Sequence, residues 1–229
     1  MKNKTMLLLI VAMVSTNLIH AQEKQQIKVE KEGEIVAPPI AMQTLALAGQ
    51  LAKYGYENNS ATALIQAAEL YLSLDMSEFK PISEEKETGK ETKKDEYISH
   101  DPIQILADAT DLASGNSVLL AMIDELKKTK QSRGAVGGPK SREYRVFANS
   151  TDTYVVRFYA NEPATVVVSG DGDSDLDLYI YDENGNLIAK DADYSDDCIV
   201  TWNPKWTGDF VIKVVNRGNV YNHYVIATN

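Results

Sequence analysis

Hydrophobic positions recur with two different periods along this chain, and the change of period divides it into two parts. From Pro39 to Leu74, and again from Asp101 to about residue 130, apolar residues recur at intervals of three and four, which predicts amphipathic helices. From Tyr144 onward, short segments alternate apolar and polar residues between turn residues, which predicts β-strands. We therefore expect an α + β chain, with a small helical domain followed by an antiparallel β-sandwich of about eight strands.

Helix start and stop residues group the first part into two helical hairpins. Pro39 suits the first turn of a helix, Gly55 is placed to end it, and Ser60 is placed to cap the next one. The second hairpin shows comparable signals at Asp101, Pro102, Gly115 and Ser117. Two interpretations stay open: a pair of stacked helical repeats, or a four-helix domain whose apolar spacing is that of any amphipathic helix. We favour the second, because repeat arrays usually need about three copies.

Eight strands are predicted in the second part. Their ranges are 144–148, 153–160, 164–169, 175–182, 187–190, 198–202, 209–216 and 222–228. In the strand 175–182, strict alternation predicts Leu176, Leu178 and Ile180 on a buried face. The opposite, polar face carries Asp175, Asp177, Tyr179 and Tyr181. The turn that follows, at residues 183–186, has the glycine and asparagines of a tight hairpin.

The first residues have the pattern of a secretory signal peptide. Lys2 and Lys4 precede an apolar run over residues 6–14, and Ala21 is a small residue at a plausible cleavage point. The run is far shorter than the roughly 20 apolar residues of a membrane-spanning helix. No cysteine lies near the cleavage point to carry a lipid. We expect residues 1–21 to be removed, no membrane span in the mature chain, and a secreted or periplasmic location.

Polar segments set the remaining boundaries. Residues 22–37 lack the apolar density of a core and predict a flexible leader. The helical domain is expected at 38–130 and includes a charged loop at 75–100, whose centre has mixed charge and no apolar residue. A glycine-rich linker is expected at 131–140, and the β-sandwich domain at 141–229.

Charge and cysteine content narrow the classes of partner and the sources of stability. The chain has 33 acidic and 23 basic residues and a formal net charge of −10. Such a surface repels phosphate and shows no basic patch interleaved with aromatic residues, so nucleic acid is not expected as a partner. Cys198 is the single cysteine, so no intramolecular disulfide can form. It lies in an apolar strand, where we expect a buried small hydrophobe.

Several segments of the second part resemble a known family. They are Asp152-Thr153-Tyr154 with Val156 and Phe158, the strand 175–182, the turn 184–186, the segment 207–214 and the closing segment 222–226. In this order they resemble the bacterial pre-peptidase C-terminal domain, a secreted β-sandwich similar to the collagen-binding domain of clostridial collagenases. The resemblance covers about residues 144–229. It implies a role in secretion, stability or substrate attachment, although the chain has no recognisable peptidase domain.

An acidic segment is the candidate metal site. Residues 171–197 contain ten acidic side chains and one basic side chain. Calcium prefers six to eight oxygen ligands, which an aspartate-rich loop can supply, and some relatives of the resembled family bind calcium. The candidate ligands are Asp173, Asp175, Asp177, Asp193, Asp196 and Asp197. The alternative is that these aspartates form turns and solubilise the surface. An EF-hand is excluded, because Leu176 replaces the turn glycine and the segment alternates as a strand.

Catalysis has little support in the sequence. The mature chain keeps only His100 and His223, which are more easily explained as structural, and it lacks the common zinc, hydrolase and nucleotide motifs. We therefore do not expect an enzyme.

Aromatic residues suggest a binding role. Trp206, Tyr194 and Tyr221 are the candidate ligand-binding residues, because exposed rings can stack on sugars or hold extended peptides. Trp202 lies in an apolar strand and is expected in the sandwich core.

Taken together, these features predict a secreted, non-catalytic binding or accessory protein. The sandwich would attach to an extracellular protein or to envelope components, with polysaccharide as a further candidate partner and calcium as a candidate cofactor. One alternative is a helical protein-interaction domain that the sandwich stabilises. Another is an accessory of a secreted hydrolase with an unrecognised catalytic site.

Overall fold

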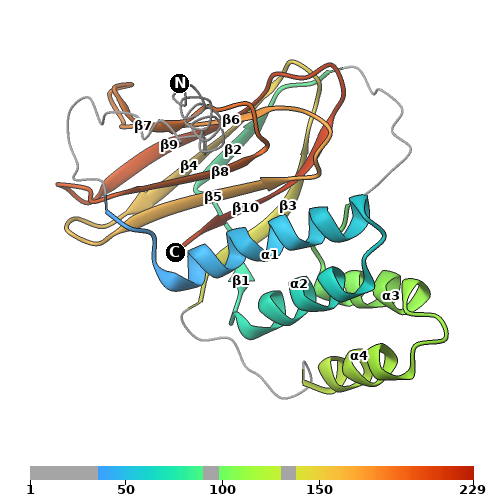
Figure 1. The fold of residues 1–229 in the computed structure, drawn as a ribbon. Helices are drawn as coiled ribbons and strands as arrows, with labels where there is room; N and C mark the ends of the chain where they lie inside the picture. Colours follow the sequence, from blue (N-terminus) through green and yellow to red (C-terminus); the bar gives the residue numbers. More distant parts are fainter. Residues whose placement is uncertain (1–35, 90–97, 130–137) are drawn as a thin grey trace, which may run out of the picture.

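The computed structural model describes residues 36–89, 98–129 and 138–229. The predicted signal peptide, the predicted leader up to residue 35, and residues 90–97 and 130–137 lie outside the described residues. In the described part of the chain, two β-sheets pack face to face and the helices lie against one of the sheets (Figure 1). The expected α + β class is confirmed. None of the described helices is both long enough and apolar enough to cross a membrane.

The elements follow the predicted order. The helices are α1 (Ile40–Glu57), α2 (Ala61–Ser73), α3 (Pro102–Leu112) and α4 (Ser117–Thr129). Two short strands, β1 (Ser77–Glu78) and β2 (Ser83–Lys86), come between α2 and α3. The eight predicted strands are β3 (Lys140–Val146), β4 (Thr151–Phe158), β5 (Ala164–Gly170), β6 (Leu176–Tyr181), β7 (Leu187–Asp191), β8 (Asp197–Trp202), β9 (Gly208–Asn216) and β10 (Asn222–Thr228).

Two five-stranded sheets form the sandwich. The helix-covered sheet has the order β1-β3-β10-β5-β8, and the open sheet has the order β2-β4-β9-β6-β7. All neighbours pair antiparallel except β1 and β3, which pair in parallel. Both sheets therefore combine strands that are distant in sequence, and both receive one edge strand from residues 77–86.

The helix-covered sheet is buried on both faces. In β5, Val166 and Val168 point into the sandwich core, whereas Val167 belongs to the apolar core of the helices. All seven residues of β5 are buried. This explains why the segment 164–170 shows a continuous run of apolar and small residues rather than alternation.

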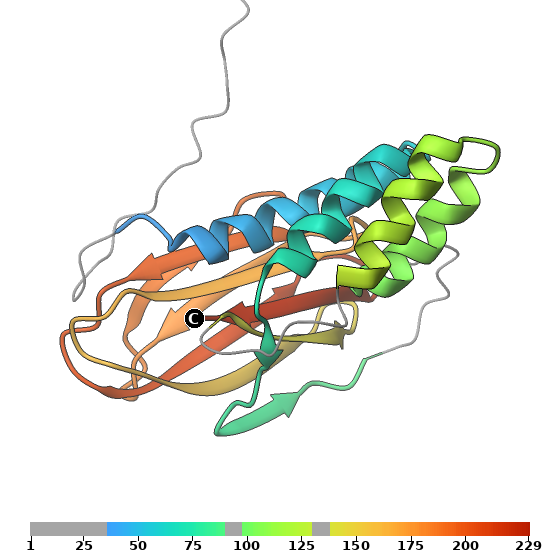
Figure 2. The same cartoon turned by 90° about the horizontal axis from the view of Figure 1, so that it is seen from below.

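The open sheet has one buried and one polar face. In β9, Phe210, Ile212 and Val214 are buried and the residues between them are partly exposed. In β6, Leu178 and Ile180 lie in the sandwich core, as the alternation predicted. Among the described residues, no helix covers the outer face of this sheet, because all four helices lie on the other side of the sandwich (Figure 2).

The helices extend away from the sandwich: α2 packs on α1, and α3 and α4 both pack on α2 and on each other (Figure 1). The hydroxyl of Ser60 caps α2 and the carboxylate of Asp101 caps α3, as predicted. Gly55 does not end the first helix, which continues to Glu57. A Cβ at Gly55 would overlap the side chain of Leu64, so this glycine allows close contact between α1 and α2. A Cβ at Gly49 would likewise overlap Ser169 of β5.

The charged segment expected as a loop at 75–100 is partly sheet, and that expectation is wrong for β1 and β2. All four side chains of β2 are exposed, so the strand has no apolar alternation to reveal it. Its backbone pairs with β4, with Ser83 opposite Val155 and Lys86 opposite Asp152. Phe79, which directly follows β1, is buried in the sandwich core and makes an edge contact with the ring of Tyr154 at 5.6 Å between centroids.

A buried carboxylate holds β2 in place. Asp152 of β4 is 1% exposed, and its Oδ2 accepts from the Lys86 ammonium at 2.6 Å and the Tyr224 hydroxyl at 2.7 Å. Lys86 also donates to the Tyr154 hydroxyl at 2.9 Å and lies 3.8 Å above the centre of the Tyr144 ring. A carboxylate taken out of water is costly unless it is paired, so the lysine of β2 completes the sandwich.

A neutral histidine is buried where the helices meet the sheet. His100 is 5% exposed, and its Nδ1 lies 2.9 Å from the hydroxyl oxygen of Tyr71. Burial, and after it the positive charge of Lys53, lowers the pKa of His100 to about 4, while Asp196 opposes the shift and His223 adds to it. The histidine therefore stays uncharged near neutral pH.

Replacing the lysine of β2 should destabilise the whole sandwich. Lys86→Met keeps the apolar stem but leaves Asp152 buried without its cation, and we expect the unfolding free energy in urea to fall by on the order of 3 kcal/mol. The matched control is Lys80→Met, because Lys80 pairs with Glu78 on the surface. That change should stay within about 0.5 kcal/mol. Equal losses in the two variants would contradict the role of Lys86.

His100 should make stability depend on pH. Below about pH 6.5 the unfolded chain protonates this histidine while the folded chain, with its pKa near 4, does not, so stability falls as pH falls. Between about pH 6.5 and about pH 5 the loss should be about 2 kcal/mol. His100→Gln retains an acceptor for Tyr71 and should flatten the slope of urea stability against pH. An unchanged slope would show that His100 is not the titrating group.

Candidate functional site

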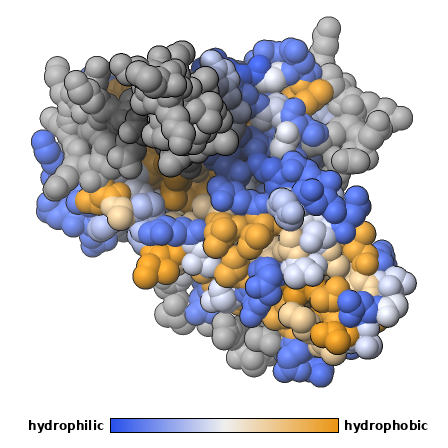
Figure 3. Space-filling view, viewed as in Figure 1, coloured by the Kyte–Doolittle hydropathy of each residue, from blue (hydrophilic) through white to orange (hydrophobic). Residues whose placement is uncertain are grey.

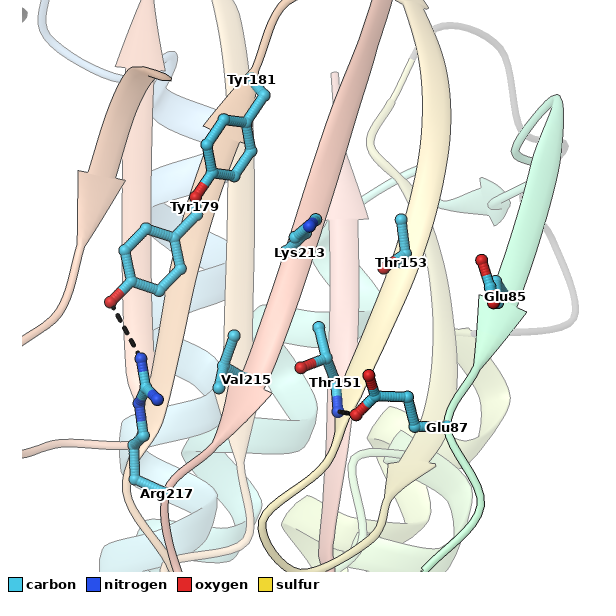
Figure 4. Close-up of a pocket in the computed structure, with 9 residues that line it drawn as sticks. All are labelled: Glu85, Glu87, Thr151, Thr153, Tyr179, Tyr181, Lys213, Val215 and Arg217. Carbon is cyan, nitrogen blue, oxygen red and sulfur yellow. Dashed lines mark hydrogen bonds between the residues drawn. The ribbon is translucent and has the colours of Figure 1, made fainter. Parts of the chain in front are cut away.

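The outer face of the open sheet contains a shallow hollow of about 540 Å³. Four strands supply its lining, and Figure 4 shows the side chains standing on one face. The lining residues are Glu85, Glu87, Thr151, Thr153, Tyr179, Tyr181, Lys213, Val215 and Arg217. They come from β2, β4, β6 and β9 and from the residues that follow β2 and β9. Because the inner face of each strand fills the core, these residues are the ones left to face solvent.

The strand register places five of the outer residues in one row across the sheet. Glu85 lies opposite Thr153, Thr153 opposite Lys213, and Lys213 opposite Tyr179. Tyr179 in turn lies opposite Lys190 of β7. Directly opposed residues point to the same side of a sheet. The row therefore runs from a carboxylate at the β2 edge to an aromatic ring between two lysines at the β7 side.

Two tyrosine rings form the floor of the hollow at β6. The ring centroids of Tyr179 and Tyr181 are 6.4 Å apart and the ring planes differ by 24°. Both residues are partly exposed. The ammonium of Lys213 lies 5.4 Å from the centre of the Tyr181 ring, within the range of a cation–π contact. The two rings thus form a nearly continuous aromatic platform with a positive charge beside it.

An ion pair fixes the orientation of one ring. Nε of Arg217 donates to Asp177 at 2.6 Å, and the Tyr179 hydroxyl donates to the same carboxylate at 3.0 Å. A second nitrogen of Arg217 donates to the Tyr179 hydroxyl at 3.2 Å. Burial is the main cause that raises the pKa of Tyr179, so its hydroxyl stays protonated. Tyr179 is therefore held in place before any ligand arrives.

The two lysines of the row have no carboxylate partner among the described residues, although Lys213 contacts the Tyr181 ring. Within the described part of the chain, neither Lys213 nor Lys190 forms an ion pair. On the β2 side, Glu87 accepts from the backbone N–H of Thr151 at 2.7 Å, which fixes the end of the segment against β4. The hollow thus presents aromatic and cationic groups on one side and hydroxyls and carboxylates on the other.

A second hollow lies between the helices and β3. Tyr56, Ser99, Asp101, Gln104, Asp108 and Glu143 line it. Its polar groups have structural duties: Asp101 caps α3, and Asp108 accepts from the Tyr56 hydroxyl at 2.6 Å. It presents no pair of aromatic faces, and we take the hollow on the open sheet as the candidate site.

The predicted metal ligands have several different partners. The ammonium of Lys53 on α1 pairs with Asp196 and, at 2.7 Å, with Asp197. Burial lowers the pKa of Lys53, but the carboxylates of Asp197 and Asp196 outweigh it and raise the net value. Asp177 pairs with Arg217, and Asp193 accepts from the hydroxyl of Ser195 at 2.6 Å. Asp173 is exposed.

Among the predicted metal ligands, Asp175 has a carboxylate whose ionised form is disfavoured by its surroundings. Its Oδ1 is buried and forms no hydrogen bond with the described residues. Burial, and then the negative charges of Asp177 and Asp193, raise the pKa of Asp175. Among residues 36–89, 98–129 and 138–229, no three His, Cys, Asp or Glu side chains are gathered as a metal site requires. Calcium binding stays a prediction.

The predicted ligand-binding aromatics lie apart from the hollow. Trp206 is partly buried, stacks on Phe210 and donates to Glu183 at 3.2 Å. Tyr194 is fully exposed, and Tyr221 makes an edge contact with the ring of His223. Trp202 and Cys198 are buried in the sandwich core, as expected. None of the three aromatics contributes to the lining of the hollow.

Most residues of the hollow were not singled out from the sequence. Strand alternation predicts Tyr179 and Tyr181 on the polar face of their strand, but no motif marks Lys213 or Thr153 as a candidate. The signal was present in β9 and β4, where polar residues alternate with buried ones. The contribution of Glu85 had no signal, because its strand was expected to be a loop.

The comparisons with known proteins give structural neighbours only. No protein-family model and no curated protein matches the chain. The pre-peptidase C-terminal domain of a collagenase from Bacillus anthracis is similar, with 13% identity over 41% of this chain and 91% of that chain and a TM-score of 0.33. This match lies in the C-terminal part of the chain, where the sequence motifs predict a resemblance to this family.

Two further solved structures match a similar share of the chain. One is PliG of Aeromonas hydrophila, a periplasmic inhibitor of g-type lysozyme, with 14% identity over 40% of this chain and 84% of that chain and a TM-score of 0.32. The other is a mitogen derived from Yersinia pseudotuberculosis, with 9% identity over 41% of this chain and 86% of that chain and a TM-score of 0.32.

Asp175→Asn tests the electrostatics of the acidic segment. Because the folded protein disfavours the ionised form of Asp175, the neutral amide should raise the melting temperature in chelator at neutral pH. Glu162→Gln, at an exposed turn, is the control and should change nothing. If the predicted calcium site exists, calcium should raise the melting temperature of the wild type and not that of Asp175→Asn. A lower melting temperature of Asp175→Asn in chelator would contradict the claim that the folded protein disfavours the ionised carboxylate.

Proposed function

We propose that this chain is a secreted, non-catalytic attachment module that binds an extended extracellular polymer on the outer face of its open sheet. The observation that supports the proposal most directly is the pair of partly exposed, nearly parallel rings of Tyr179 and Tyr181 beside Lys213. Exposure of an aromatic ring face to water is unfavourable. Exposed rings are therefore typical of binding sites, where a ligand covers them. Secretion rests on the pattern of residues 1–21.

The shape of the site suits a long ligand better than a small molecule. The row from Glu85 to Lys190 crosses five strands, which is about 19 Å at the usual strand spacing. Small-molecule sites are typically concave and enclose most of the ligand. A shallow, hydrated face instead contacts one side of a chain at several successive points.

The chemistry of the hollow favours binding over catalysis. Glu85 and Glu87 are exposed, and Thr151 and Thr153 lie between them and the lysine side. Acid–base catalysis by carboxyl groups depends on environments that move their pKa values apart. An open face of exposed carboxylates and hydroxyls is better suited to form hydrogen bonds with a polar polymer.

A second candidate function is supported by the helices. Apolar side chains gather over the helical layer in the space-filling view (Figure 3). Val118 is 68% exposed and Met122 is 40% exposed on α4, and Leu112 on α3 is 41% exposed. Exposed apolar patches often mark protein contacts. A protein-interaction role of the helices is therefore the alternative to binding through the open sheet.

Removing either ring should weaken binding without unfolding the protein. We expect Tyr179→Ala and Tyr181→Ala each to lower the affinity for a bound polymer at least about fivefold, the usual effect of losing a central aromatic contact. Depletion of the mature protein by gelatin, cellulose, chitin, polygalacturonate and isolated cell envelopes measures this. Tyr194→Ala is the matched control, because Tyr194 is fully exposed elsewhere on the sandwich.

The two candidate functions give opposite outcomes in this assay. Binding through the open sheet is supported if the tyrosine variants lose binding and the double variant Val118→Ser, Met122→Ser retains it. Binding that only the α4 variant loses supports the helices and rejects the proposal. Binding to no polymer, or binding equally strong in all variants, would also reject it.

A further inference from the structure

We infer that the polymer bound by the open sheet is an acidic polysaccharide whose sugar units carry carboxylates, as in chains of uronic acids. The inference rests on the proposed function and names the ligand class of the same site. Its basis is the arrangement of an aromatic ring between two lysines without a carboxylate partner among the described residues, next to exposed hydroxyl and carboxylate groups.

The two lysines flank one ring from both sides. Lys213 of β9 and Lys190 of β7 both lie directly opposite Tyr179 in the strand pairing. Directly opposed side chains have Cβ atoms about 5 Å apart, so each ammonium can reach a group stacked on the ring. The nearby Arg217 is already paired with Asp177. The free positive charge of the site is therefore concentrated on either side of Tyr179.

A stacked sugar that carries a carboxylate fits this arrangement. The apolar face of the sugar ring would cover a tyrosine, as exposed aromatic rings allow. The carboxylate, at the edge of the sugar ring, would then meet the ammonium of Lys213 or Lys190 in a charge-assisted contact. The ring of Tyr181, 6.4 Å from that of Tyr179, offers a second stacking position for the same chain.

The opposite side of the hollow separates this ligand from other polyanions. Glu85 and Glu87 are exposed at the β2 edge, next to the hydroxyls of Thr151 and Thr153. These carboxylates repel any acidic chain, and a polyglutamate chain has no hydroxyl whose hydrogen bonds would offset that repulsion. They accept hydrogen bonds from sugar hydroxyls. A uronic acid unit has one carboxylate and several hydroxyls, which matches both sides.

The overall charge makes the local positive charge informative. The protein has a formal net charge of −10, so general attraction to polyanions is unfavourable. Nucleic acids are bound largely by many phosphate contacts, and these two lysines supply few of them. Binding of an acidic chain here must come from a local match, which confines it to ligands with a stacking face.

The test compares two forms of one polymer that differ in charge. The mature protein is titrated with polygalacturonate and with fully methyl-esterified polygalacturonate, in which each carboxylate is an uncharged ester. We expect binding to the charged form that weakens at high salt. Lys213→Met and Lys190→Met should each lower this affinity about threefold to fivefold, as the loss of an exposed charge pair does. Lys213→Arg should retain it, and Lys205→Met, at an exposed turn, is the control.

The outcomes separate this inference from the proposed function. Preference for the charged form, with loss in both methionine variants and not in Lys205→Met, supports the inference. Equal affinity for both forms, or no effect of the lysine variants, overturns it while tyrosine-dependent binding leaves the attachment function standing. Tight, lysine-dependent binding of polyglutamate assigns the site to acidic peptides and overturns it. The absence of binding to polygalacturonate also overturns the inference. Melting temperatures, measured for each variant, show that the variant is folded.

Discussion

Burial of one sheet on both faces determines much of this architecture. The apolar residues of β5 point alternately to two cores, with Val166 and Val168 toward the sandwich and Val167 toward the helices. Water exposure of either face would cost the transfer free energy of a whole row of side chains. The helices are therefore required on that side. The other sheet keeps its outer face for contacts with solvent or ligand.

Charges reinforce the contacts between these layers. Lys53 reaches from α1 to Asp196 and Asp197 at the start of β8, and Lys86 reaches from β2 to Asp152. In both cases a lysine from the N-terminal half neutralises a carboxylate of the C-terminal half. These ion pairs thus connect the N-terminal and C-terminal halves of the chain, and the composition alone does not reveal them. The division into two separate domains stays a prediction.

The elements that could be predicted are those with a local physical cause. Ser60 and Asp101 cap helices because their side-chain oxygens satisfy free backbone N–H groups. Leu178 and Ile180 are buried because a strand has a period of two. Such features need no knowledge of distant contacts. The bounds of β4 to β10 therefore lie within two residues of the predicted ranges, whereas β3 begins four residues before its predicted start.

The elements that were missed depend on contacts between distant segments. β2 has four exposed side chains and exists because the edge of β4 offers backbone partners. Gly55 lies inside a helix because Leu64 packs against it. The row across the open sheet combines Glu85, Thr153 and Lys213, which only the strand order brings together. Alternation indicated which residues face outward, but not which strands are neighbours.

The origin of β2 has a consequence for the integrity of the sandwich. This strand precedes α3 and α4 in the chain, so the helical hairpin interrupts the sequence of the sandwich between β2 and β3. A fragment that begins at residue 138 would contain eight strands and expose β4 as a bare edge. Unpaired edge strands join readily to other copies. The N-terminal half therefore also protects the sandwich against self-association.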